Sequence, residues 1–162
     1  MKTWIEKHSI GLSLVLVVAV MVMIFCFSAQ NGNTSGALSG RITTWVIKLV
    51  LPDFDELPLP EQEALRGSVG LAIRKAAHFS EYTLLGVSLL LHILQIRKRL
   101  PVSKPWLWAW VTGVAYAVSD ELHQGLVADR NPSAVDVLID GSGVLFGIGV
   151  LALCLWLRRK KQ

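Results

Sequence analysis

Ionisable side chains in this sequence gather in three short runs at the edges of apolar stretches. The runs are Arg74-Lys75-Ala76-Ala77-His78-Phe79-Ser80-Glu81-Tyr82, then Asp120-Glu121-Leu122-His123-Gln124, then Arg130 with Asp136 and Asp140. Carboxylates and imidazoles serve as general acids and bases, while Arg and Lys bind anionic groups. These residue types therefore favour a site that binds an anionic ligand or carries out acid–base chemistry on it.

Each of these side chains is given a candidate role from its chemistry. The candidates for acid–base catalysis are Glu81, Asp120, His78 and His123. The candidates for ligand binding are Arg74, Lys75, Tyr82, Glu121, Gln124, Arg130, Asp136 and Asp140. In this hypothesis a carboxylate such as Glu81 or Asp120 is the base and a histidine is its partner. Arg74 or Arg130 would hold the anionic group.

A metal-assisted reaction is a variant of the same hypothesis. Its ligands would be His123, Asp120, Glu81 and Asp136. No ligand spacing here matches a strong metal-binding motif, so neither a metal nor a cofactor is predicted. The sequence also has no serine-nucleophile motif, no P-loop and no HExxH. Carboxylates and histidines are left as the reactive groups.

Long apolar runs indicate the helices that position these residues. The chain has 162 residues, 52% of them apolar, and a mean hydropathy of +0.50, which is too high for an ordinary soluble domain. Residues 9–27 contain no charge and are long enough to cross a bilayer. We predict a single all-α integral membrane domain over residues 1–162, with four transmembrane helices at about 9–28, 76–96, 106–124 and 136–157. A cleaved signal peptide is the competing interpretation of the first run.

The distribution of charge orients these spans. Ten of the 16 Lys and Arg residues, with a single acid, lie at the two termini and between the second and third spans. The other six lie on the opposite side with 11 of the 12 acids. The positive-inside rule therefore predicts cytoplasmic termini and an extracytoplasmic segment 29–75. The net charge of +4 then reflects anchoring beside anionic lipid, and nucleic-acid binding is not expected.

The segment 29–75 is predicted to hold an amphipathic helix. It opens with a turn-rich run, residues 30–36. Apolar residues then recur at helical spacing at Ile42, Trp45, Val46, Leu49 and Val50. This apolar face either lies on the outer leaflet or packs on the bundle.

Prolines and glycines give further expectations for the helices. Pro60, followed by acidic residues, marks the start of a helix that runs into the second span with a kink near Gly67 and Gly70. In the last span Gly143 and Gly147 have the GxxxG spacing. That spacing favours close helix packing over a role in holding phosphate.

Depth in the membrane brings the three runs together. At about 1.5 Å per residue, Glu81 lies roughly 9 Å below Lys75, and Asp140 lies roughly 6 Å below the start of its span. Asp120 lies within about 10 Å of the outer end of its own helix. A charge in the membrane interior costs at least about 2.5 kcal/mol, so such groups face a protein interior or a wet cavity. An outward-open polar pocket is therefore predicted.

Two structural alternatives remain open for these residues. Arg74, Lys75 and Tyr82 also suit interfacial anchoring. Glu81 and Asp120 also suit a buried ion pair with Arg74 or Arg130. Neither alternative needs a ligand.

Four motifs occur in a fixed order along the chain. Phe27-Ser28-Ala29-Gln30 ends the first span, RKAAHFSEYTLLG and DELHQ follow, and Arg130 precedes DVLIDGSG. In this order they resemble the VanZ-like family of bacterial membrane proteins over roughly residues 25–149. The sequence departs from the usual pattern at Ala29, where Ser is common, and at Ala128-Asp129, where Pro-Gly commonly precedes the Arg.

The resemblance carries its own expectations. It implies a four-helix membrane domain, and the namesake of the family is associated with resistance to the glycopeptide teicoplanin. It implies matching positions at Arg74, Lys75, His78, Glu81, Tyr82, Asp120, Glu121, His123, Gln124, Arg130, Asp136 and Gly143. The expected location is the bacterial cell membrane.

Three functions are compatible with these expectations. One is an enzyme acting on a lipid-linked or peptidoglycan-related molecule of the cell envelope. Another is a non-catalytic module that binds a glycopeptide, a lipid headgroup or a partner protein. The third is a proton-coupled transporter with Glu81 and Asp120 as relays. Membrane lipids and an envelope precursor or glycopeptide are the expected partners.

Overall fold

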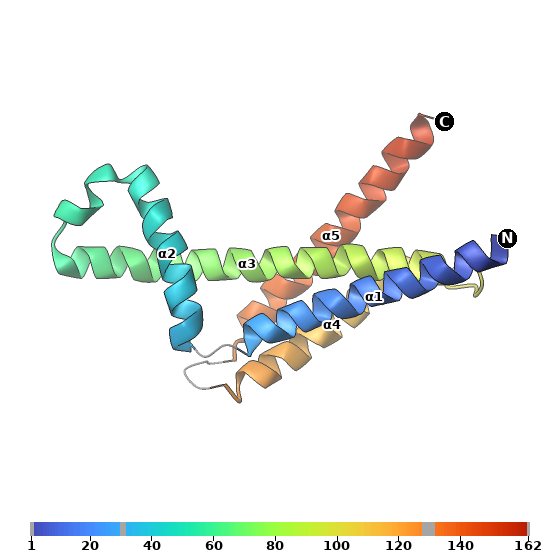
Figure 1. Ribbon diagram of the computed structural model, residues 1–162, viewed down its shortest axis with the longest axis horizontal. Coiled ribbons are helices and arrows are strands. Elements are labelled where there is room, and N and C mark those ends of the chain that lie inside the picture. Colours follow the sequence, from blue (N-terminus) through green and yellow to red (C-terminus); the bar gives the residue numbers. More distant parts are fainter. Residues whose placement is uncertain (1, 30–31, 128–131, 162) are drawn as a thin grey trace.

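The computed structural model describes residues 2–29, 32–127 and 132–161, and these ranges are helical throughout apart from short connections (Figure 1). The elements in chain order are α1 (Lys2–Ser28), α2 (Gly32–Val50), the short 3-10 helix η1 (Pro52–Glu56), α3 (Leu59–Ile96), α4 (Pro105–Gln124) and α5 (Ala134–Lys160). No strand occurs in the described ranges. The predicted all-α class is therefore confirmed.

Three of the helices are long and apolar enough to cross a membrane. They are α1 from His8 to Ser28, α3 and α5. The 20-residue α4 coincides with the third predicted span and is long enough to cross, but it is not among the helices whose hydropathy suffices. Its polar end, which includes Asp120 and Glu121, and the low hydropathy index of its tryptophans reduce its mean hydropathy. The chain thus has the helices of a membrane protein, in agreement with its composition.

Contacts along the helices show that they alternate in direction. The Ser13 hydroxyl lies 2.9 Å from His92 Nδ1, so the start of α1 meets the end of α3. The Tyr116 hydroxyl donates to the Met21 carbonyl at 2.6 Å, and the last turns of α1 and α4 also meet. α1 therefore runs parallel to α4 and antiparallel to α3 (Figure 1).

Glycines allow α3 and α5 to pack backbone against backbone. A Cβ atom placed on Gly147 would lie 2.1 Å from the Thr83 carbonyl oxygen, and one on Gly143 would lie 2.6 Å from that of Phe79. On the other side, a Cβ on Gly86 would lie 2.2 Å from the Val144 carbonyl oxygen. The close packing predicted from the GxxxG spacing is confirmed. Gly143 meets Phe79 and Gly147, four residues later, meets Thr83, also four residues later. The two helices therefore cross while running in the same direction.

The α2 helix differs from the sequence prediction in two ways. It begins at Gly32, so the turn predicted for residues 30–36 is wrong from Gly32 onward, while residues 30 and 31 lie outside the described ranges. Extending an existing helix costs far less than nucleating one, and α2 is anchored further on, where Thr43 and Ile47 are buried. The predicted apolar face, represented by Ile42 and Trp45, is half or more exposed. It does not pack on the bundle.

The α3 helix starts as predicted but does not bend. Pro58 precedes Leu59, Pro60 occupies the first turn, and the helix is unbroken through Gly67 and Gly70 (Figure 1). The predicted kink is wrong, and one reason is that Thr43 of α2 lies against Gly70. At 38 residues, α3 is about 57 Å long, nearly twice the thickness of a hydrocarbon core. Part of it must therefore extend beyond the membrane.

Candidate functional site

Asp120 is held in place where α1 and α4 end together. Its Oδ2 atom accepts a hydrogen bond from the Ser28 hydroxyl at 2.9 Å and another from Gln124 Nε2 at 3.1 Å. All three side chains are buried. Asp120 and Gln124 are four residues apart and thus share one face of α4. This network fixes the position of the Asp120 carboxylate inside the bundle.

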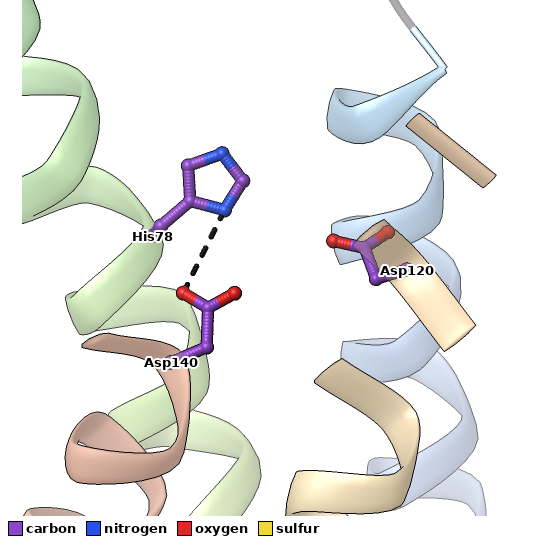
Figure 2. A group of neighbouring side chains, drawn as sticks. All are labelled: His78, Asp120 and Asp140. Carbon is purple, nitrogen blue, oxygen red and sulfur yellow. Dashed lines mark ion pairs between the residues drawn. The ribbon is translucent and has the colours of Figure 1, made fainter. Parts of the chain in front are cut away.

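His78 and Asp140 complete a group of three with Asp120. Figure 2 shows the His78 ring above Asp140, with Asp120 facing them from α4, and Nδ1 of His78 lies 3.9 Å from Oδ1 of Asp140. One potential ligand atom from each of the three residues lies within 4.8 Å of the other two. Since α3, α4 and α5 supply one residue each, the site depends on the tertiary fold. Such a group can share a proton or hold a cation.

The Asp140 carboxylate has an unusual environment. Its side chain is fully buried, and neither of its oxygens accepts a hydrogen bond from the described residues. Among those residues, no Lys or Arg nitrogen lies within 4.0 Å of Asp120 or Asp140. Buried polar groups nearly always have partners, and an exception asks for an explanation. Within the described part of the chain, the site therefore concentrates acidic groups with no Lys or Arg nitrogen close enough to form an ion pair with Asp120 or Asp140.

Tyr82 lies one turn beyond His78 on α3 and lines the same region. It is fully buried, and its ring centroid lies 6.3 Å from that of Tyr116. Tyr82 belongs to the apolar core together with Val17, Leu85 and Val144, and Tyr116 packs against that core. Burial among aromatic rings excludes bulk water from this side of the group.

The start of α5 is tied to α3 and α4 at the rim of the site. Lys75 Nζ donates to Asp136 Oδ1 at 2.6 Å. Glu121 Oε2 accepts from the Ser133 backbone N–H at 2.8 Å, and the Ser133 hydroxyl caps the helix at Val135. These contacts stabilise the N-terminal turn of α5, where acids interact favourably with the helix dipole. Lys75, Asp136 and Glu121 thus fix the start of α5 relative to α3 and α4, next to the three central residues.

Other predicted site residues lie outside the group of three. Glu81 is partly buried on α3, and the His123 ring stacks on Phe25 with centroids 4.5 Å apart. Arg74 is exposed and forms no salt bridge with any described residue. Arg130 lies outside the described ranges. Among the residues described, the alternative ion pair between Asp120 and Arg74 is therefore not formed.

Two features of the structure had no place in the sequence hypothesis. Ser28 was not a candidate site residue, although it belongs to the Phe27-Ser28-Ala29-Gln30 motif that ends the first span. The second feature is an open hollow of about 570 Å³ lined by Gly40, Arg41, Thr44, Trp45, Lys48 and Arg66. Its basic residues come from two helices, Arg41 and Lys48 from α2 and Arg66 from α3.

Comparison with known proteins identifies a family. A sequence model of the VanZ/LLP1 family matches residues 13–156. The comparisons with curated proteins and with solved structures give no match. The matched range runs from α1 to near the end of α5 and contains His78, Asp120 and Asp140.

Proposed function

The chain belongs to the VanZ/LLP1 family, and from this premise we propose that it binds or acts on a cell-envelope or glycopeptide-related ligand in an outward-facing polar pocket. The consequence for the cell would be a contribution to resistance against glycopeptides such as teicoplanin. The observation that carries the proposal is the convergence of His78, Asp120 and Asp140 from three helices at one place in the bundle. Groups that are costly to keep inside a membrane bundle generally serve a function.

The outward orientation of the pocket follows from a four-span topology. Three helices have the length and composition to cross a membrane. The α4 helix follows α3 and precedes α5 in the chain, and it runs in the direction opposite to both. The positive-inside rule then places both termini and the connection from α3 to α4 in the cytoplasm. The pocket lies at the opposite ends of the helices. The exposed apolar face of α2, including Trp45 and Leu49, suits a helix lying in the outer leaflet.

Cysteine labelling in intact cells tests this topology. After Cys26 and Cys154 are replaced by serine, Asp53→Cys in η1 is expected to react with a membrane-impermeant maleimide added outside. Ser103→Cys, between α3 and α4, is expected to react only after the cells are opened. Both positions are exposed, so their labelling reports the side of the membrane and not burial. Labelling of Ser103→Cys from outside would reverse the orientation and place the pocket in the cytoplasm.

Asp120→Asn is expected to abolish any increase in teicoplanin resistance that the wild-type chain confers on a susceptible Gram-positive host. The substitution keeps the size of the side chain and an oxygen that can accept from Ser28 and Gln124, so the protein should still insert and accumulate. What it removes is the negative charge and its capacity as a base. The minimum inhibitory concentration, compared at equal membrane levels by immunoblot, is the measurement.

Asp55→Asn is the matched control for this experiment. Asp55 is exposed and pairs with Lys48 at 2.6 Å, away from the three central residues. This variant should retain wild-type resistance. Full resistance in the Asp120→Asn strain would remove the acidic centre from the proposed pocket.

Turnover separates the two forms of the proposal. Purified protein would be incubated with a labelled lipid-linked envelope precursor, with binding and product followed in the same reaction. Conversion that is lost in Asp120→Asn identifies an enzyme that uses this carboxylate. Saturable binding without product identifies a binding module. Absence of both, together with unchanged resistance in the variant, would contradict the proposed function.

A further inference from the structure

We propose that His78, Asp120 and Asp140 form a binding site for one divalent first-row transition-metal ion of the zinc type. This proposal rests on the proposed function only in placing the metal ion inside the same pocket. It is a different assignment from the metal variant considered from sequence, whose ligands were His123, Asp120, Glu81 and Asp136. Of those four candidate ligands only Asp120 lies in the group of three.

The geometry of the group is close to that of a bound ion. Ligand atoms about 2.0–2.1 Å from a tetrahedral ion are separated from each other by roughly 3.3 Å. The three candidate atoms lie within 4.8 Å of one another, and the His78–Asp140 pair is at 3.9 Å. Small changes of side-chain torsion angles would bring the atoms to coordinating distances, without movement of the helices.

The unpartnered carboxylate of Asp140 is the second, independent observation. It is completely buried and accepts no hydrogen bond from the described residues, and Nδ1 of His78, which carries a charge only when the ring is protonated, lies 3.9 Å from its Oδ1. A buried ion without adequate compensation is strongly unfavourable. A divalent cation between Asp120 and Asp140 would supply that compensation.

Asp120 already has the surroundings of an oriented ligand. Hydrogen bonds from the Ser28 hydroxyl and from Gln124 Nε2 both end on its Oδ2 atom and orient the carboxylate. Metal-binding carboxylates are commonly fixed in this way by outer partners. The site also has access from outside, because the His78 side chain retains 23% of its surface.

The ligand set selects the class of metal. Calcium and magnesium prefer oxygen-only shells, while an imidazole together with carboxylates suits zinc, manganese or iron. Three protein ligands leave at least one coordination position open, as in catalytic metal sites. An anionic group of the envelope ligand, or a water molecule, would take that position. The metal would thus deepen the function of the same pocket.

Metal titration of the purified full-length protein tests this proposal without any envelope ligand. The protein, prepared without a histidine tag and stripped with a chelator in detergent micelles, would be titrated with cobalt(II) and zinc(II). Cobalt is expected to give visible d–d absorption with one ion per chain, and zinc is expected to displace it. His78→Ala and Asp140→Asn are each expected to weaken binding at least about tenfold, since even outer partners of a metal contribute 10-fold to 100-fold.

His92→Gln is the matched histidine control. His92 contacts Ser13 at the opposite end of the bundle, so its replacement should leave the titration unchanged. If His78→Ala loses its helical circular dichroism, Asp140→Asn decides the question, because it retains the side-chain volume. Equal cobalt binding by wild type and a folded Asp140→Asn variant, or no binding by wild type, would overturn the metal site. The resistance test of Asp120 would stand regardless, so the two proposals fail separately.

Discussion

Gly147→Val is expected to prevent the native packing of α3 against α5 and to remove most folded protein from the membrane. Even the first carbon of a side chain at this position would lie 2.1 Å from the Thr83 carbonyl oxygen and 3.1 Å from the Val87 nitrogen. These obstacles are backbone atoms, which cannot rotate away as a side chain can. Overpacking of a core typically costs 1–3 kcal/mol, and we expect a loss of about 3 kcal/mol or more here.

Gly149→Val provides the matched control on the same helix. A Cβ atom at Gly149 has nothing within 4 Å, so the same substitution adds volume only on an exposed face. Unfolding in increasing SDS after detergent extraction, together with the yield in the membrane fraction, measures the difference. Equal stability of the two variants would show that α3 and α5 do not pack through their glycines.

The helix ends were largely predictable from the sequence, because charge and apolar runs set them. Residues 9–28 and 136–157 were predicted spans, and they lie within α1 and α5. The start of α3 near Pro60 was also predicted, since a proline fits the first turn of a helix. An apolar run bounded by charges determines where a helix lies along the membrane normal.

The rotation of each helix about its axis was much less predictable. In α1, Val17, Val20 and Ile24 are buried while Leu12, Val15 and Val22 are exposed. Both faces are apolar, because lipid and protein core select the same residue types. On α4 the same ambiguity hid the difference between His123, which stacks on Phe25, and Gln124, which binds Asp120.

Depth alone therefore placed the candidate residues at one level, but the glycines decide which of them meet. Gly143 lies against Phe79, and one residue earlier on α3 is His78. Asp140 lies three residues before Gly143 and is thus carried towards His78 by the same crossing. From sequence, Glu81 was a catalytic candidate and Arg74 a ligand-binding candidate beside His78 and Asp140, since no pattern shows which face of α3 the glycines of α5 approach. The packing contact and the site are consequences of one helix crossing.

The same substitution at the two central carboxylates is expected to change stability in opposite directions. Asp120→Ala removes the acceptor of two hydrogen bonds and leaves the buried Ser28 hydroxyl and Gln124 amide without it. Each buried group that loses its partner costs about 1–3 kcal/mol. Asp140→Ala instead removes a fully buried carboxylate that accepts no hydrogen bond from the described residues. It should raise stability by an amount of similar order, reduced by the small cavity that alanine leaves.

Thermal unfolding in detergent with a chelator present measures both effects, because the chelator excludes any stabilisation by a bound ion. A higher midpoint for Asp140→Ala and a lower one for Asp120→Ala are the expected results. Addition of zinc should then raise the midpoint of wild type and leave that of Asp140→Ala nearly unchanged, since only the former retains the full ligand set. In that case Asp140 would lower the stability of the fold while Asp120 raises it. A residue that is retained although it lowers stability indicates selection for function. If Asp140→Ala lowers the midpoint as far as Asp120→Ala in the chelator, Asp140 supports the structure like any other core residue, and the case for a binding centre at this crossing is lost.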